Sequence, residues 1–251
     1  MKAIILAAGK GSRMDSKTEN KPKCMIQYNE KEIINYILDS LTEAGIDDII
    51  IVDGYKNYIL EEHLKKSNIK FITNKNYSST NMVYSLFCAE SEMNDDIIVS
   101  YSDIIYNKKT LNKLINNKSE FSVAVDKKWL ELWKLRMEDP LSDAETMKID
   151  EYGSIIELGK KPKSYKEIQG QYIGLFKIKN RRLKEIRNFY HGLNKTDIYD
   201  GNNYNNMYMT TFIQLIIDKL LPIRAEIIEG GWLEFDTVND INSYNLNKVF
   251  L

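Results

Sequence analysis

The first 105 residues alternate short β-branched runs with amphipathic stretches, and this alternation restricts the fold more than any other feature of the sequence. Each β-branched run has the length of a buried strand, and apolar residues recur at helical spacing in the stretches between them. Repeated strand–helix units of this kind are typical of a parallel sheet that helices cover on both faces. The sequence therefore predicts an α/β, doubly wound, Rossmann-like fold. The expected strands are residues 3–8, 48–53, 70–73 and 97–101, and the expected helices are 32–44, 58–66 and 81–91.

The second half of the chain is less regular. Because 251 residues are near the upper limit for one hydrophobic core, we expect one domain with an insertion rather than two independent domains. The expected elements are strands 121–125, 172–178 and 223–228, a hairpin of 147–149 with 155–158, a helical or irregular segment over 129–137, and helices over 182–190, over 208–220 and after Asp236.

The composition excludes several classes of function. With 35 Lys and Arg against 36 Asp and Glu, the chain lacks the diffuse basic field that sequence-independent nucleic-acid binding needs, so any bound anion must be held locally. Cys24 and Cys88 cannot form a disulfide framework or a zinc site. The first apolar run is too short for a signal peptide, and no run reaches the roughly 18 apolar residues of a membrane helix. We therefore expect a cytoplasmic protein with no nucleic-acid or membrane partner.

The strongest local motif follows the first expected strand. It reads LAAGKGSR over residues 6–13, and Thr18 and Pro22-Lys23 come after it. Glycines directly after a buried strand let backbone N–H groups converge on a phosphate at the carboxyl edge of the sheet. Arg13 and Lys23 close this loop with two cations, which indicates a triphosphate. The loop residues that we expect to bind the nucleotide are Leu6, Ala7, Ala8, Gly9, Gly11, Ser12, Arg13 and Lys23.

Other readings of the glycines are weaker. A dinucleotide-binding fingerprint needs a glycine where Met14 stands and a carboxylate about 20 residues further on, so an NAD(P)-dependent oxidoreductase is disfavoured. A P-loop needs a Gly-Lys-Ser/Thr ending, which the motif does not have. His63 and His191 have no clustered partners in the sequence and indicate neither a metal site nor a nucleophilic site.

The longer pattern resembles a known family. The LAAGKGSR string with Thr18 and Pro22-Lys23, the VDGY turn at 52–55 and the EFDT string at 234–237 resemble the sugar-phosphate nucleotidyltransferase superfamily, in its small cytidylyltransferase branch. The resemblance covers nearly the whole chain. Further similarity to enzymes that activate phosphoglutamine, phosphonates or phosphocholine with CTP lies in residues 80–86, 100–106, 139–146, 157–161, 171–176 and 206–210.

The resemblance implies an architecture and an activity. It implies a mixed sheet with an inserted acceptor-binding subdomain, in a single domain over 1–251 with a nucleotide-binding part (1–106), an acceptor-binding part (107–230) and a C-terminal metal-ligand strand and helix (231–251). It also implies Mg²⁺-dependent transfer of CMP from CTP to a small phosphorylated or phosphonate acceptor, with release of pyrophosphate. The product would be a CDP-activated precursor for surface (capsule) polysaccharide modification with phosphoramidate. The oligomeric state stays open.

The acceptor is ranked by one departure from the family pattern. Phosphocholine enzymes carry an acidic residue beside the aromatic that corresponds to Tyr208, whereas this chain has Met209-Thr210-Thr211. We therefore expect L-glutamine phosphate first, an aminoalkylphosphonate second and phosphocholine third, with a sugar 1-phosphate as the alternative. A catalytically silent nucleotide-binding protein is a rival reading, which the joint presence of both cations and of Asp103 and Asp236 disfavours.

Nucleotidyl transfer needs charge neutralisation more than a base. The acceptor oxygen is already anionic, so the barrier lies mainly in bringing two polyanions together, and we expect Lys23 and Arg13 to be the catalytic cations. Mg²⁺ usually takes one or two carboxylates, and the resemblance assigns it to Asp103 and Asp236. The plain alternatives are a turn-forming Asp103 at a strand end and an Asp236 that caps the last helix.

The base and acceptor contacts are predicted from single residues rather than from a continuous motif. For the base we expect Gly54, Tyr55, Asn81 and Ser85, with Asn81 equally explained as a helix N-cap and the cytosine preference resting on the resemblance. For the acceptor, we expect Glu145 to meet an ammonium, and the resemblance implies that Lys160 meets the phosphate. The aromatic candidates for the acceptor are Trp129, Tyr172 and Tyr208; the spacing of Trp129 and Trp133 fits core packing at least as well as a binding site.

Overall fold

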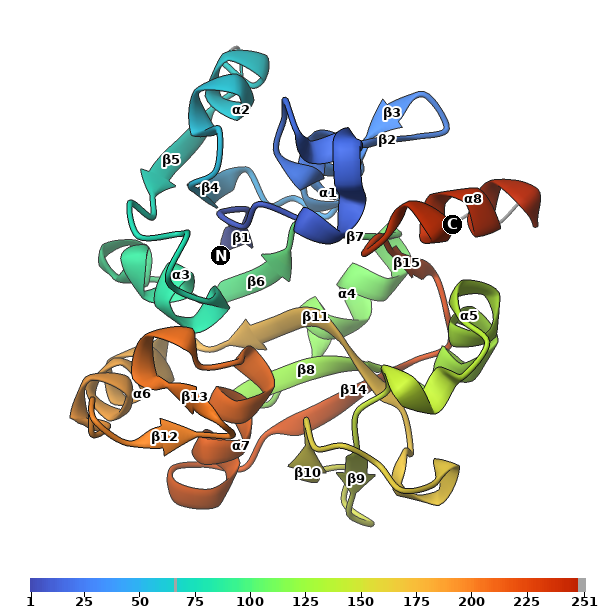
Figure 1. Ribbon diagram of the computed structural model, residues 1–251. Coiled ribbons are helices and arrows are strands. Elements are labelled where there is room, and N and C mark those ends of the chain that lie inside the picture. The colour runs from blue at the N-terminus through green and yellow to red at the C-terminus, as the bar shows by residue number, and fades with distance from the viewer. Residues whose placement is uncertain (66, 248–251) are drawn as a thin grey trace.

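The computed structural model describes residues 1–65 and 67–247, and a seven-stranded sheet runs through its centre (Figure 1). The strand order is β14-β8-β11-β6-β1-β4-β5, so strands from both halves of the chain share one sheet. β11 is antiparallel to both of its neighbours, while the remaining ladders of the sheet are parallel. The strands are β1 (Lys2–Leu6), β4 (Asp48–Asp53), β5 (Ile69–Thr73), β6 (Ile97–Tyr101), β8 (Phe121–Asp126), β11 (Gln171–Ile178) and β14 (Arg224–Ile228).

Helices cover both faces of this sheet. Alternate residues of β1 enter opposite core clusters, Ala3 and Ile5 on one side and Ile4 and Leu6 on the other, because successive side chains of a strand point to opposite faces. The first cluster includes residues of α1, α4, α5 and α8, and the second includes residues of α3, α6 and α7. The helices are α1 (Ile33–Glu43), α2 (Asn57–His63), α3 (Met82–Cys88), α4 (Lys108–Asn116), α5 (Trp129–Arg136), α6 (Asn180–Gly192), α7 (Met209–Lys219) and α8 (Val238–Leu246).

Within residues 1–65 and 67–247, four short two-stranded ladders accompany the main sheet, and one of them brings together parts of the site. β15 (Trp232–Glu234) pairs antiparallel with β7 (Ile104–Tyr106), which brings the C-terminal segment back to the end of β6. The other ladders are β2 (Gln27–Tyr28) with β3 (Lys31–Glu32), β9 (Met147–Ile149) with β10 (Ile155–Leu158), and β12 (Ile198–Tyr199) with β13 (Asn202–Asn203).

The predicted doubly wound α/β fold is confirmed, and the main differences lie at the ends of elements. The strand expected over 3–8 is β1, which ends at Leu6, because the chain turns into the glycine loop after it. The helix expected over 81–91 is shorter, because Asn81 is its N-cap and the chain tightens into a 3-10 turn over Glu90–Glu92. The helix expected over 58–66 is α2, which ends at His63; the expected last residue, Lys66, lies outside the described residues. Within 1–65 and 67–247, no helix combines the length and the apolar character that crossing a membrane requires.

Candidate active site

The site lies at the carboxyl end of β1, between β4 and β6. In doubly wound sheets this is where strand connections leave toward opposite faces and where ligands bind. The loop after β1 bends at Gly11, whose φ of +65° is a left-handed conformation that glycine adopts without strain. A Cβ on Gly11 would stand 2.8 Å from the Cβ of Lys23. Glycine at this position therefore lets Lys23 pack directly against the loop.

Lys23 bridges the two predicted metal ligands. Its Nζ lies 2.7 Å from Oδ2 of Asp103 and 2.8 Å from Oδ1 of Asp236. Burial opposes the charge on Lys23, but the two carboxylates outweigh it and raise its pKa to about 12. Burial alone would raise the pKa of Asp236, yet the neighbouring Lys23, Arg13 and Arg136 hold it below its usual range. The cluster thus keeps its charges by mutual neutralisation.

The two aspartates arrive from segments far apart in the sequence. Asp103 follows β6, and its backbone oxygen accepts a hydrogen bond from the N–H of Phe235 at 2.8 Å, which ties it to the segment after β15. Thr237, and not Asp236, is the N-cap of α8, in a capping box with Asp240. The cap alternative for Asp236 is therefore wrong: its backbone N–H is held by Asp240, and its carboxylate is left for the cations.

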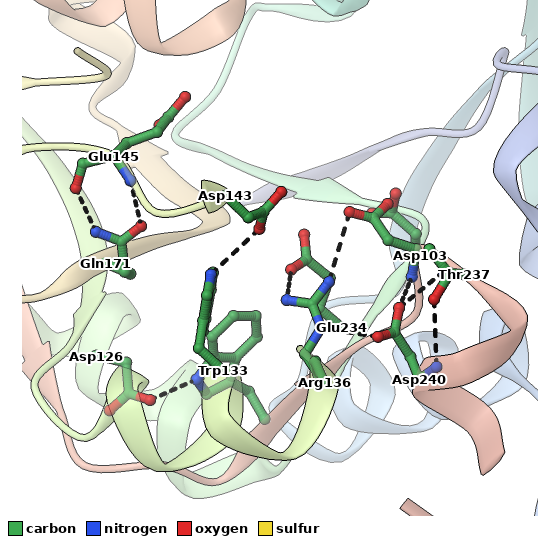
Figure 2. A network of polar contacts seen from close by, with 12 residues as sticks. Asp103, Asp126, Trp133, Arg136, Asp143, Glu145, Gln171, Glu234, Thr237 and Asp240 are labelled. Carbon is green, nitrogen blue, oxygen red and sulfur yellow. Dashed lines mark hydrogen bonds and ion pairs between the residues drawn. The ribbon is translucent and has the colours of Figure 1, made fainter. Parts of the chain in front are cut away.

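A buried arginine supports this arrangement from behind. Arg136 of α5 has a side chain that is only 2% exposed, and its Nε donates to Oδ1 of Asp240 at 3.1 Å (Figure 2). It also pairs with Glu234 and lies 3.6 Å from Oδ2 of Asp236. Sequence reasoning missed Arg136; the available signal was an arginine among the apolar residues of the 129–137 segment. A charged side chain in such a segment, when buried, requires partners.

The first hollow of the site combines the glycine loop, the cations and the aspartates. Of the predicted residues, it is lined by Leu6, Ala8, Gly9, Gly11, Ser12, Arg13, Lys23, Asn81, Ser85, Asp103 and Asp236. Asn81 fits both predicted roles, helix cap and base contact. Its side chain caps α3 by accepting from the N–H of Met82, and it also lines the hollow. Tyr77, Thr80, Met82, Tyr101 and Ser102 complete the lining and were not predicted.

Three predicted nucleotide contacts lie behind this lining. Ala7 is buried in the core. Gly54 packs against the loop: a Cβ there would stand 2.8 Å from the backbone oxygen of Ala8. The N–H of Tyr55 donates to the same oxygen, and its hydroxyl donates to the backbone oxygen of Thr18. In this structure these three residues hold the loop in shape and do not face the hollow.

A second hollow adjoins the first and is acidic and aromatic. The two hollows share Arg13, Asn81, Met82, Tyr101 and Asp236 in their walls. The predicted acceptor residues that line the second hollow are Glu145, Tyr172 and Tyr208, and the structure adds Trp133, Asp143, Gln171, Ile173, Gly174, Met209, Thr210 and Glu234.

The backbone of Glu145 is fixed by the side chain of Gln171. The amide of Gln171 accepts from the N–H of Glu145 at 3.0 Å and donates to its backbone oxygen at 2.6 Å (Figure 2). Burial, together with the charge of Asp143, raises the pKa of Glu145 to about 7. Such a carboxyl gains most from a cationic partner, because a nearby positive charge favours its ionised form.

The structure separates two predicted acceptor residues from this hollow. Trp129 is buried in the core and packs edge-on against Trp133, so of the two tryptophans only Trp133 reaches the lining. The side chain of Lys160 is 60% exposed. Its Nζ lies 3.6 Å from Oε2 of Glu157, three residues earlier in the chain. Its place in the acceptor site stays a prediction from the resemblance.

The residues present fit a hard divalent ion. Oδ1 of Asp103 is buried with no hydrogen-bond partner, which leaves one carboxylate oxygen free to ligate. Among the described residues, no three His, Cys, Asp or Glu side chains form a ready metal cluster. A pair of carboxylates completed by phosphate oxygens and water is the arrangement that Mg²⁺ usually takes. Asp103 and Asp236 are therefore the residues that would hold the ion.

Comparison with known proteins points to one family. A sequence model described as the MobA-like NTP transferase domain matches residues 3–149. The chain is 46% identical to the CTP:phosphoglutamine cytidylyltransferase of Campylobacter jejuni, over 96% of this chain and 98% of that one. It is 36% identical to the choline-phosphate cytidylyltransferase of Streptococcus pneumoniae, over 49% of this chain and 53% of that one.

Two solved structures share the fold. The CTP:phosphocholine cytidylyltransferase from Streptococcus pneumoniae superimposes with a TM-score of 0.73 at 21% identity, over 99% of each chain. The inositol-1-phosphate CTP transferase from T. maritima superimposes with a TM-score of 0.76 at 20% identity, over 98% of this chain and 93% of that one.

Proposed function

Because the chain belongs to the MobA-like NTP transferase family, we propose that it is a Mg²⁺-dependent cytidylyltransferase that transfers CMP from CTP to a small phosphorylated acceptor. An acceptor phosphate oxygen forms a bond to the α-phosphorus of CTP, the bond from that phosphorus to the bridging oxygen breaks, and pyrophosphate leaves. The membership confirms the resemblance seen in the sequence. The observation that carries the proposal is the pair of adjoining hollows, with Asp236 in both walls. One is lined by the glycine loop, two cations and two aspartates, and the other by acidic and aromatic side chains.

The chain's own cations hold the triphosphate. Lys23 stays protonated at neutral pH, since its pKa is raised to about 12, and Arg13 is 65% exposed at the mouth of the hollow. A guanidinium matches two phosphate oxygens at once, whereas an ammonium acts as a point charge. Together they neutralise the phosphates and orient them toward the second hollow, which lowers the cost of bringing two anions together.

A divalent ion would be held by Asp103 and Asp236. When bound, it would add positive charge at the phosphates and so favour departure of pyrophosphate. Asp240 accepts hydrogen bonds from the backbone N–H groups of Asp236 and Thr237. These bonds fix the backbone of Asp236 and so help to direct the Asp236 carboxylate.

The second hollow fits an acceptor that carries an ammonium group. Its acidic side chains are Asp143, Glu145, Glu234 and Asp236. L-Glutamine phosphate, aminoalkylphosphonates and phosphocholine all carry a positive nitrogen, whereas a neutral sugar 1-phosphate has none to offset these charges. Among the three we favour L-glutamine phosphate, because the relative at 46% identity is a CTP:phosphoglutamine cytidylyltransferase. The CDP-linked product would serve surface-polysaccharide modification from a cytoplasmic enzyme.

Pyrophosphate release tests the proposal. The assay combines CTP, UTP, ATP or GTP with L-glutamine phosphate, aminoethylphosphonate, phosphocholine or a sugar 1-phosphate, each with Mg²⁺. We expect turnover with CTP and an ammonium-bearing acceptor, and the Glu145→Gln variant should raise KM for that acceptor while leaving KM for CTP unchanged. Turnover only with sugar 1-phosphates would contradict the acceptor assignment, and no turnover with CTP would contradict the activity.

A further inference from the structure

We propose that Asn74 is a positioning residue that sets the preference for cytosine over uracil, by fixing the Ser85 hydroxyl as a hydrogen-bond donor toward the base. The inference rests on the proposed function in one respect, because it takes the first hollow as the nucleotide site. Asn74 itself does not line that hollow: it is 1% exposed, directly after β5, and its N–H donates to the backbone oxygen of Asp53 at 2.8 Å.

The orientation of the Asn74 amide is determined by a backbone group. The N–H of Asn76 lies 2.9 Å from Oδ1 of Asn74, and a backbone N–H can only donate, so this atom is the amide oxygen. The amide nitrogen must then face the other way. It donates to Oγ1 of Thr80 and to Oγ of Ser85, each at 3.0 Å.

Both hydroxyls therefore accept from Asn74 and must send their own protons elsewhere. Thr80 donates to the backbone oxygen of Asn76 at 2.9 Å, so its proton is already used. For Ser85 the partner within the protein is the backbone oxygen of Asn81 at 3.4 Å, which is at the long end of hydrogen-bond distances. Because Ser85 lines the first hollow, its proton is available to a ligand there.

A donor at this point distinguishes the two pyrimidines. Cytosine presents an acceptor at N3, whereas uracil carries a proton at N3. The Ser85 hydroxyl donates to N3 of cytosine, but it would place one donor against another with uracil. Leaving a buried donor without a partner commonly costs about tenfold or more in affinity. Asn74 thus acts on specificity through Ser85, without touching the nucleotide.

The Asn74→Asp substitution tests this directly. It keeps the shape of the side chain but replaces the donating nitrogen by an accepting oxygen, so the Ser85 proton turns toward the carboxylate and a lone pair faces the base. Titration calorimetry measures the preference for CTP as the Kd of MgUTP divided by the Kd of MgCTP. This ratio should fall by about tenfold in Asn74→Asp, and Ser85→Ala should lower it as well. Ser79→Ala is the matched control, because the Ser79 hydroxyl belongs to the same turn and donates to the backbone oxygen of Asn76 at 3.3 Å but does not line the first hollow, and this variant should keep the wild-type ratio.

A modified nucleotide makes the test independent of folding and of the acceptor. 3-Deazacytidine triphosphate keeps the amino group and O2 but has a C–H at position 3, so the wild-type protein should bind it about tenfold more weakly than CTP, and Ser85→Ala should bind the two equally. An unchanged CTP-to-UTP ratio in folded Asn74→Asp and Ser85→Ala variants would overturn the inference, as would equal wild-type affinity for CTP and its 3-deaza analogue. Failure of pyrophosphate release with every acceptor would instead count against the proposed function alone.

Discussion

At the scale of single residues, Lys23 is the side chain that links the phosphate loop to the metal ligands. In the structure its ammonium contacts Oδ2 of Asp103 and Oδ1 of Asp236, so it neutralises the two carboxylates that would also hold a divalent ion. Lys23 and the ion would therefore compete for the negative charge of these carboxylates. The phosphates of a nucleotide offer Lys23 another partner when the ion is bound.

Lys23→Met should separate metal binding from turnover. Without the ammonium, the two carboxylates repel each other and gain from any cation, so the variant should bind Mn²⁺ alone at least about tenfold more tightly than the wild type. Turnover should nevertheless fall by about a hundredfold or more, because the phosphates lose a charge partner. Electron paramagnetic resonance of free Mn²⁺ measures the first effect. Weaker Mn²⁺ binding in the variant would contradict competition between Lys23 and the metal.

The two aspartates should differ from their acidic neighbour. Asp103→Asn and Asp236→Asn should each lower kcat by about a hundredfold or more at saturating Mg²⁺, with little change in thermal unfolding, since Lys23 keeps one carboxylate partner in each variant. Asp240→Asn is the matched control: it weakens the cap of α8 and the pairing of Arg136, so it should lower the melting temperature more than those variants do. Full activity in either site variant would remove that residue from the site.

Individual residues also show how far the sequence could be interpreted. Asp103 and Asp236 were predicted as metal ligands from the family resemblance, since a position at a strand end fits a turn residue equally well. Arg136 and Asp240 were not selected, because their pairing joins residues 104 positions apart and no local period marks such a contact. Trp129 and Trp133 are four residues apart on α5, so their spacing alone does not tell which of them lines the hollow. The packing of α5 places Trp133 in the lining.

At the scale of elements, the loop between β1 and the segment of Lys23 is shaped by close approach rather than by flexibility. The hydroxyl of Thr18 donates to the backbone oxygen of Gly11 at 3.1 Å, and the backbone oxygen of Ala8 accepts from Tyr55 at 3.0 Å. These contacts hold both ends of the bend. The bend therefore sets the distance between the loop backbone and the Lys23 side chain.

Gly11→Ala should disturb the site through this contact. The added Cβ would meet Lys23 at 2.8 Å and would also require φ near +65°, so the loop must shift and KM for CTP should rise by about tenfold. Gly45→Ala is the matched control, because it has φ +79° with open space around its Cβ, at the end of α1. Both variants should lose about 1 kcal/mol of unfolding free energy, but Gly45→Ala should keep the wild-type KM. Equal KM values in the two variants would contradict the steric argument.

Elements of the first half were more predictable than those of the second. β1, β4 and β6 are built on continuous apolar runs, and α1 has a clear apolar face. The direction of β11 could not be obtained from its residues, since a buried strand has the same pattern in either direction. β15 pairs with β7, which lies more than a hundred residues earlier in the chain. Each of these strands has only three residues, which is too short for a periodic pattern that would predict the pairing.

At the scale of the whole molecule, burial of carboxyl groups ties stability to pH. Burial, with the charge of Glu61, raises the pKa of Asp53 to about 6, and burial, with Asp143, raises that of Glu145 to about 7. An unfolded carboxyl titrates near 4, so the folded protein holds these protons more tightly than the unfolded chain does. Their contribution to stability is complete below about pH 4 and is lost as the pH rises through 6 to 7.

We expect the melting temperature to fall between about pH 5 and pH 8, as these two groups lose their protons. The double variant Asp53→Asn with Glu145→Gln should flatten this fall, because neither amide titrates. Glu92→Gln is the control, because hydrogen bonds from Lys70 and Lys2 lower the pKa of Glu92. The contribution of Glu92 to stability is therefore lost at acidic pH, and the fall of the melting temperature above pH 6 should be the same in this variant as in the wild type. Differential scanning calorimetry over this range decides, and an equal slope in wild type and double variant would contradict the assignment.

The common wall of the two hollows has a consequence for the rate of the enzyme. Arg13, Asn81 and Asp236 face both hollows, so the nucleotide half and the acceptor half of the finished product remain in contact with the protein on either side of the new bond. Because the two parts of the product are covalently joined, a part that dissociates can rebind while the other part stays bound to the protein. Departure of the product, rather than bond formation, is therefore the step that we expect to limit turnover, and a non-hydrolysable mimic of that product should inhibit more strongly than either substrate fragment.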